Sequence, residues 1–259
     1  MKRISLLFFF ILTSRLFGSG FDDTVLWIYD LPDGSSVFFA KETTKICNPG
    51  LRASFLYSNP YGIDAIDWND LFIRKGFGRW GTFARLNSYG LKSRYNRYIY
   101  NAGVAIKLSD SISASIDALY HFEHFEGVGG FGRTEGNGKL SYYRGAIHTV
   151  VGLTGIKMEE NSKSYAPGPR GWGAITYNFK NGTSFSGSVR RFENGRSRWL
   201  FSQRTPLARD FGLSIGVINR PDVIFGRLEL AHSFFSLELA YYSISRLSDT
   251  VVFGFAVGE

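Results

Sequence analysis

Cysteine is nearly absent from this sequence, since Cys47 is the only one among 259 residues. A single thiol cannot form an internal disulfide, so an exported chain of this size relies on backbone pairing and burial for its stability. Long helical spans are missing as well, and no helical segment reaches the length of a transmembrane helix. Glycine and aromatic residues are abundant instead, with 30 glycines and 17% Phe, Trp and Tyr. These features exclude a disulfide-stapled domain and a helical membrane protein.

Sequence motifs of enzymes are also missing. Serine, histidine and aspartate all occur, but no nucleophile-elbow sequence places a serine for a catalytic triad. The segment GVGGFG, Gly127–Gly132, matches the glycine spacing of a dinucleotide-binding turn. However, Gly136 and Gly138 follow, where a helix would have to present its amino end to a pyrophosphate. We interpret residues 125–140 as a flexible loop, in a protein that is not an enzyme and binds no cofactor.

Two of the four histidines lie in the segment YHFEHFEG, residues 120–127. Imidazole and carboxylate groups are the usual ligands of zinc and iron. The residues before and within this segment alternate with a period of two, and one face holds Ile112, Ala114, Ile116, Ala118, Tyr120 and Phe122. This period predicts a β-strand, on which neighbouring side chains point to opposite faces. His121 and Glu123 then share a face without His124, and no metal site is predicted.

The first 20 residues have the layout of a secretory signal peptide. Lys2 and Arg3 precede an apolar run over residues 4–12, and residues 18–20 supply small side chains for cleavage. Removing the three charges of Lys2, Arg3 and Arg15 lowers the net charge from +8 to +5. Such a modest excess in an exported protein does not favour nucleic acid, and the expected partners are outer-membrane lipid and lipopolysaccharide.

From residue 50 onward the chain is a series of strand candidates, each roughly 9–13 residues long, separated by turn signals. One of these turns is Asn181-Gly182, the strongest short signal for a β-hairpin. Counting the candidates gives about thirteen strands after residue 50, with another near residues 24–31. Short turns between successive strands imply an antiparallel meander.

Each predicted strand has one apolar face and one face of charged residues, serine and glycine. Strands of about 9–11 residues with this alternation and aromatic ends are typical of outer-membrane barrels, whose apolar face contacts lipid. We therefore predict an all-β fold, an antiparallel up-and-down transmembrane β-barrel of about 14 strands, with 12 as the alternative. The barrel occupies residues 51–259, after a signal peptide over residues 1–20 and a segment over residues 21–50 that forms a plug or a first strand. The alternative is a soluble exported β-sandwich or a lipocalin-like binding protein, whose apolar face points inward.

Strand parity also assigns individual side chains to the two faces. The residues predicted to face the lumen are Lys107, Asp117, His121, Glu123, Arg227, Glu229 and Glu238. The aromatic residues predicted to face lipid are Tyr98, Tyr100, Tyr120, Phe122, Phe235, Tyr241, Phe253 and Phe255. We expect Asp117 to pair with a cationic side chain, with Lys107 among the candidates, and we find no long apolar stretch in the lumen-facing parity. The cluster around the turn at residues 193–195 is interpreted as a lipopolysaccharide contact and consists of Arg190, Arg191, Arg196 and Arg198.

Three segments carry a resemblance to a known family: NPGL (Asn48–Leu51), FLYSNPYGIDAIDW (Phe55–Trp68) and FARLNSYGLKSRYNR (Phe83–Arg97). Through them the mature chain resembles the FadL-type outer-membrane barrels and their PorV-type relatives. The resemblance implies an outer-membrane protein of a Gram-negative-type bacterium. It further implies either a passage or binding pore for a small hydrophobic compound, or a secretion-associated barrel that handles an exported protein. In the family the N-terminal region can act as a plug, although here DLPDGSSVFFAKETTKI replaces its usual small-residue stretch.

Overall fold

The computed structural model describes residues 43–60, 66–91, 95–160, 170–191, 197–219, 222–244 and 249–258. The predicted signal peptide and the strand expected near residues 24–31 lie outside this part of the chain, so both stay predictions. The described residues form fourteen β-strands and the five-residue helix α3 (Thr43–Cys47). No helix within these ranges is long and apolar enough to cross a membrane.

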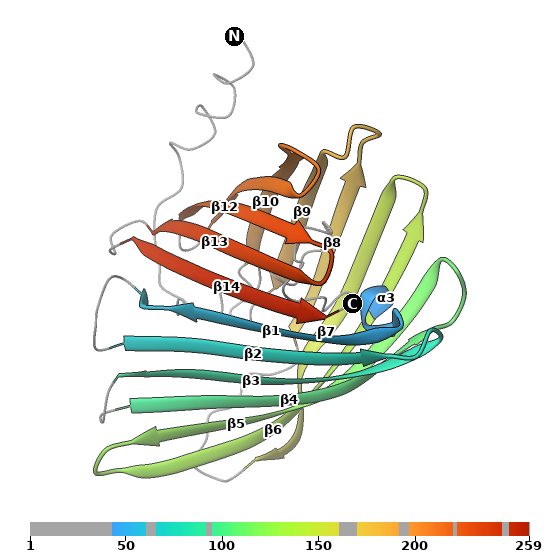
Figure 1. Ribbon diagram of the computed structural model, residues 1–259. Coiled ribbons are helices and arrows are strands. Elements are labelled where there is room, and N and C mark those ends of the chain that lie inside the picture. The colour runs from blue at the N-terminus through green and yellow to red at the C-terminus, as the bar shows by residue number, and fades with distance from the viewer. Residues whose placement is uncertain are drawn as a thin grey trace.

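The strands follow one another around a single closed barrel (Figure 1), and β14 completes the ring by pairing with β1. Their bounds are β1 (Gly50–Ser58), β2 (Ile66–Gly76), β3 (Trp80–Leu91), β4 (Tyr95–Lys107), β5 (Ile112–Phe125), β6 (Gly129–Arg144), β7 (Ile147–Glu160), β8 (Arg170–Asn178), β9 (Ser184–Arg191), β10 (Ser197–Pro206), β11 (Phe211–Ile218), β12 (Val223–His232), β13 (Phe235–Ile244) and β14 (Thr250–Gly258). The predicted all-β up-and-down barrel of about 14 strands is confirmed. Closure removes the two free edges that an open sheet would present to other chains.

Side chains alternate between the two faces of the barrel wall, and the apolar face points outward. Ile116 and Leu239 leave 65% and 51% of their surface exposed, whereas the neighbouring Asp117 and Glu238 are 9% and 1% exposed. A soluble β-protein shows the reverse, with apolar side chains inside and polar ones in water. The alternative of a soluble β-sandwich or a lipocalin-like protein therefore does not fit this structure.

The prediction of a loop over residues 125–140 was wrong, because most of this segment belongs to β6. A three-residue turn at 126–128 leads directly into the strand. Gly127 and Gly129 have φ angles of 75° and 103° at this turn, in the left-handed region that glycine adopts without steric cost. The glycine pattern thus reflects a tight turn and not a nucleotide-binding loop.

The next glycines of β6 receive aromatic rings from β5. A Cβ atom built on Gly130 would lie 2.7 Å from the Phe122 ring, and one on Gly132 would lie 2.5 Å from the Tyr120 hydroxyl. Only a residue without a side chain leaves room for these rings, which explains why the strand is rich in glycine. Glycine weakens the alternating apolar signal of a strand, and this is why the sequence alone did not reveal β6.

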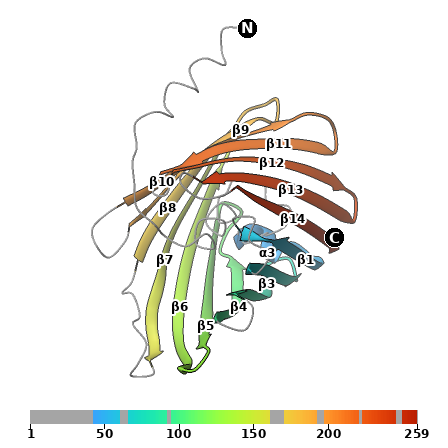
Figure 2. The same ribbon diagram turned by 90° about the vertical axis from the view of Figure 1, so that its left-hand side faces the viewer.

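With β6 in place, the connections separate cleanly into two ends. We call the end at which β1 begins and β14 finishes the turn end, because its hairpins are short. The opposite loop end carries the connections over residues 59–65, 161–169 and 192–196. The predicted hairpin at Asn181-Gly182 is confirmed at the turn end, where the Phe179 N–H donates to the Thr183 carbonyl over 2.8 Å. The strands β5, β6 and β7 reach farther than β9 to β14, so the loop-end rim is uneven (Figure 2).

Candidate functional site

The inner face of the barrel carries more cationic than anionic side chains. Strand parity and pairing place on this face the cations Arg52, Arg74, Arg85, Arg97, Lys107, Arg133, Lys139, Arg170, Arg190, Arg198, Arg204 and Arg227. The anions there are Asp70, Asp117, Glu123, Glu135, Glu229 and Glu238. Among the described residues the lumen is therefore positively charged. Low-dielectric walls strengthen the field of such a lining and raise the local concentration of anions.

A polar cavity of about 130 Å³ opens into the lumen beside β2 to β9. Its lining residues are Phe72, Phe83, Arg85, Ile99, Asn101, Ser115, Asp117, Leu119, His121, Glu135, Asn137, Lys139, Thr154, Arg170 and Arg190. We call it the lumen cavity. The structure brings two of the predicted lumen-facing residues, Asp117 and His121, into this cavity, and places Glu123 on the same face two residues farther along β5.

The carboxylates of the lumen cavity have close partners within the wall. Asp117 accepts hydrogen bonds from the side-chain amides of Asn101 and Asn137, each over 2.7 Å. Glu135 lies 2.8 Å from Arg133 Nε and 3.5 Å from His121 Nε2. The expectation that Asp117 pairs with a cation was wrong for the described residues, since two amides satisfy it. Neutral amides hold its position without cancelling its charge.

Lys107 lies elsewhere, at the turn end, where its ammonium donates to Asn48 Oδ1 over 3.2 Å. The separation follows from the antiparallel register, which pairs Lys107 with Ser113 and leaves Asp117 opposite Gly103. Asn48 follows helix α3, which packs across the turn end against β2, β3 and β4. Helix α3 packs closely against Gly76 and Gly81. A Cβ atom on either glycine would come within 2.3 Å of the α3 backbone or of the residues just after it.

Helix α3 narrows the turn end of the lumen (Figure 1). The Gly78 N–H donates to the Cys47 carbonyl over 2.8 Å, and Arg74 Nη1 donates to the Asn48 carbonyl over 3.1 Å. Ile46 and Cys47 are fully buried at this contact. Burial raises the pKa of the Cys47 thiol above its usual value.

The remaining predicted lumen-facing residues form a second charged cluster on β10 to β13. Glu229 and Glu238 lie directly opposite each other on β12 and β13, and both are almost fully buried. Arg227 Nε lies 3.3 Å from Glu229 Oε1 and 4.0 Å from Glu238 Oε2, while Arg204 Nε reaches Glu229 Oε2 at 3.3 Å. Two arginines thus offset two adjacent carboxylates, whose mutual repulsion would otherwise destabilise this part of the wall.

The interpretation of the arginine cluster as a lipopolysaccharide contact was wrong for two of its members. Arg190 and Arg198 are paired with each other across β9 and β10 and face the lumen, where Arg198 is only 4% exposed. Arg191 points to the opposite face and is exposed. Arg196 lies outside the described residues. The physical reason is strand parity, because β9 continues to residue 191 and alternation puts Arg190 on the same face as Ser188.

Sequence reasoning missed an apolar arc on the inner face of the barrel. The inner apolar belt consists of Leu56, Trp68, Leu200, Ile218, Val223, Phe225, Tyr242 and Val252, each at most 3% exposed. These residues come from β10 through β14 to β2 and lie in the half of each strand nearer the loop end. Each strand contributes only one or two of them, so no single strand shows an apolar lumen-facing run. The belt appears only when the strand register is known.

All eight aromatic residues predicted to face lipid lie on the outward parity of their strands. Tyr100, Tyr120, Tyr241, Phe253 and Phe255 are between 40% and 50% exposed, and Tyr98, Phe122 and Phe235 are half-buried against neighbouring side chains. The structure places these residues but does not test their contact with lipid, which stays a prediction. Aromatic rings on the outer wall near strand ends are typical of membrane barrels.

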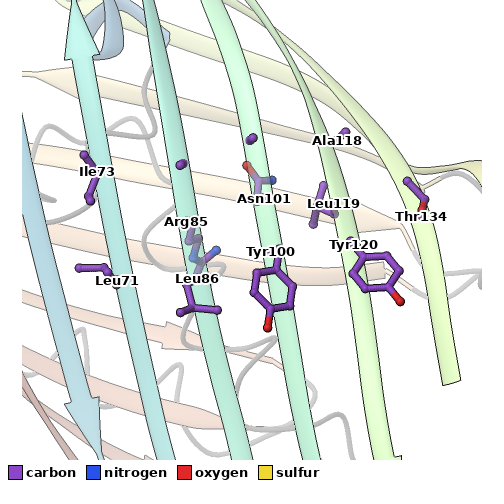
Figure 3. Close-up of a pocket in the computed structure, with 12 residues that line it drawn as sticks. Leu71, Ile73, Arg85, Leu86, Tyr100, Asn101, Ala118, Leu119, Tyr120 and Thr134 are labelled. Atoms are coloured by element: carbon purple, nitrogen blue, oxygen red, sulfur yellow. The ribbon is translucent and has the colours of Figure 1, made fainter. Parts of the chain in front are cut away.

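The outer wall is hollowed in two places where small residues meet. Ala84, Ala102 and Ala118 are paired in register across β3, β4 and β5. They form the floor of a depression of about 480 Å³, bordered by Tyr100 and Tyr120 (Figure 3). A second, nearly apolar groove of about 760 Å³ runs over β8 to β13. Both are shallow features of a continuous wall.

No group of three or more potential metal ligands occurs among the described residues. His121 has Glu135 and Arg133 as its charged neighbours, and His124 points to the other face of β5. An arginine beside the carboxylate competes with any bound cation, so this arrangement is unsuited to a metal ion.

The chain matches no protein-family model and no curated protein. Solved structures with a similar fold include a FadL homologue of Pseudomonas aeruginosa, with a TM-score of 0.54 and 8% identity over 83% of this chain and 92% of that chain. The CymD monoaromatic hydrocarbon channel matches with a TM-score of 0.53 and 10% identity over 81% and 87% of the two chains. The Acinetobacter baumannii outer membrane protein Omp33 matches with a TM-score of 0.54 and 7% identity over 81% and 97%.

At these identities the likeness concerns the fold alone. The fold is that of the outer-membrane β-barrels, the class to which the FadL-type resemblance points. The comparisons do not reach the PorV-type relationship, which stays a prediction.

Proposed function

We propose that this protein is a non-enzymatic outer-membrane barrel that passes or binds small compounds with an apolar part. The observation that carries the proposal is the inner apolar belt. A lumen lined only by polar groups would serve water-soluble solutes, whereas an arc of lumen-facing Leu, Trp, Phe and Tyr side chains gives the lumen an apolar side that favours solutes with an apolar part. Within the arc the rings of Phe225 and Tyr242 stack on each other, with their centroids 6.0 Å apart.

The orientation of the barrel follows from its connections. Short turns face the periplasm in outer-membrane barrels, and longer loops face outward. The turn end with helix α3 therefore faces the periplasm, and the inner apolar belt lies near the outside. An entering compound would meet the belt before the charged middle of the lumen. The predicted signal peptide and the expected location in the outer membrane of a Gram-negative-type bacterium agree with this orientation.

The continuous barrel wall favours passage of a solute along the barrel axis over a lateral route through the wall. The described strands β8 to β14 pair without any shift in register. Among the described pairs, register shifts occur between β6 and β7, where the Gly155 N–H donates to Asn137 Oδ1 over 3.1 Å. The amide side chain thus fills the gap in the ladder from inside and keeps the wall closed.

A secretion-associated role is the alternative within the same class of barrels. It predicts that an exported polypeptide stays bound to the loops, and no described feature of the barrel favours it over a pore. The protein should therefore be purified from outer membranes, and any bound material identified by mass spectrometry. A bound small apolar molecule supports the pore, whereas a stoichiometric polypeptide supports the secretion role.

Transport is tested most sharply in vesicles. Proteoliposomes loaded with phenyl glucoside or with glucose are compared, because the sugar keeps both solutes from crossing the bilayer unaided. Wild type and the belt variant Leu200→Gln are assayed together, with Leu200→Ile as the matched control. We expect wild type and Leu200→Ile to release phenyl glucoside faster than protein-free vesicles, and Leu200→Gln to slow this release several-fold. Release of phenyl glucoside no faster than from protein-free vesicles would refute the proposed pore.

A further inference from the structure

The lumen cavity contains polar atoms that lack a hydrogen-bond partner. Arg190 Nε, His121 Nδ1 and the Asn101 carbonyl oxygen are all buried, and none has a partner among the described atoms. Buried polar groups in folded proteins are almost always paired. Two of the three atoms are nitrogens of groups that can donate. Such atoms point to a ligand or to ordered water in this cavity.

More positive than negative side chains line the cavity. On the β5 and β6 side the carboxylates are already engaged, Asp117 by two amides and Glu135 by Arg133 and His121. On the β8 and β9 side the lining groups are cationic. Four Lys or Arg side chains line the cavity with only two carboxylates, so a solute entering it meets net positive charge.

The register brings the cationic groups onto one level of the wall. Lys139 pairs with Gly152, Gly152 with Trp172, and Trp172 with Arg190. Gly152 has no side chain, so the Trp172 indole leans over it, and a Cβ atom there would lie 2.5 Å from the indole nitrogen. The Lys139 ammonium lies 5.7 Å from the indole ring centroid. Lys139 on β6 and Arg190 on β9 both line the lumen cavity, on either side of the strands that carry Gly152 and Trp172.

We propose that the lumen cavity is a binding site for an oxyanion, the carboxylate or phosphate group of a small solute, held by Arg190 and Lys139. The inference rests on the proposed function in that the solute enters through the same lumen. Guanidinium and ammonium groups are the usual donors to carboxylate and phosphate. A space of about 130 Å³ admits the charged group of a solute and not a large ligand as a whole. The site makes the barrel prefer anionic over neutral or cationic solutes of the same size.

Equilibrium binding to the purified folded barrel tests this site without any transport. Isothermal titration is carried out with benzoate, with inorganic phosphate and with uncharged benzyl alcohol. The variants are Arg190→Gln and the matched control Arg191→Gln, whose side chain is the next in β9 but points to the opposite face. We expect wild type and Arg191→Gln to bind benzoate equally, and Arg190→Gln to bind it roughly tenfold to a hundredfold more weakly. Tight binding of benzoate alone indicates an organic acid, and tight binding of phosphate indicates a phosphate group.

Two outcomes would overturn the proposal. Absence of saturable binding of either anion to folded wild type, or equal losses in the Arg190 and Arg191 variants, shows that no oxyanion site exists there. Folding of each variant is checked by its heat-dependent mobility on gels, and if Arg190→Gln does not fold, Lys139→Gln is judged by the same criterion. Release of phenyl glucoside from vesicles is measured separately. A barrel that binds anions but releases phenyl glucoside no faster than protein-free vesicles refutes the pore and leaves the anion site standing.

Discussion

Leu239 provides the sharpest test of which face of the barrel meets the membrane. It lies near the middle of β13, points outward and leaves 51% of its surface exposed. Its cross-strand neighbours Leu228 and Phe253 are equally exposed and apolar. If this surface meets hydrocarbon, Leu239→Arg costs about 2–4 kcal/mol at the bilayer midplane. That range corresponds to a loss of roughly thirtyfold to several hundredfold in the folding equilibrium.

The matched control is Leu207→Arg, the same change at a side chain that is 58% exposed in the turn between β10 and β11. Near the interface an arginine costs about 0–1 kcal/mol. Both variants are folded into phosphatidylcholine vesicles and titrated with urea, with the heat-dependent gel mobility reporting the folded fraction. A midpoint for Leu239→Arg that equals that of Leu207→Arg would refute the lipid-facing assignment, since a water-exposed surface tolerates both changes alike.

Four further substitutions test other parts of the structure. Arg85→Ala leaves the fully buried Asp70 without its arginine. It should lower the free energy of unfolding by about 3–5 kcal/mol. In the same urea titration, the double variant Arg85→Ala with Asp70→Asn should recover much of this loss. Phe122→Asp should impair insertion into vesicles, because a charge replaces the outward-facing ring. His121→Ala should fold nearly as well as wild type, and atomic absorption should show the same metal content as in wild type. Stoichiometric zinc in wild type, lost on His121→Ala, would contradict that expectation. Gly152→Val forces a side chain into the neighbouring indole of Trp172. It should lower the urea midpoint by the equivalent of about 1–3 kcal/mol. An unchanged midpoint would show that the indole moves freely.

The sequence was sufficient for the fold class because the barrel depends on a short-range signal. A period of two in β4, β5, β12 and β13 separates outward-facing from lumen-facing residues without any knowledge of neighbours. Turn chemistry adds the hairpins, as at Asn181-Gly182. The signal fails where glycine replaces apolar residues, as in β6. There the rings of Phe122 and Tyr120 cover the gaps, and that contact is made across strands.

The site could be predicted only in part, because it depends on register. The parity of β5 placed Asp117 and His121 on the inner face, but their partners come from β4 and β6 at positions that the turns determine. The same holds for Arg190, whose role changes once β9 is known to extend through it. The inner apolar belt is the clearest case, since seven neighbouring strands each contribute one or two residues, and the arc is continuous only because β14 pairs with β1.

The measurement that tests the central claim most directly is the lipid accessibility of three consecutive residues of β4. In a Cys47→Ser background, single cysteines replace Tyr100, Asn101 and Ala102, and each carries a bimane fluorophore in vesicles with and without brominated lipid. The barrel described above predicts strong quenching at 100 and 102 and little at 101, which faces the lumen cavity. Equal quenching at all three positions, or quenching at 101 alone, would contradict a closed barrel with an apolar outer wall and a charged lumen.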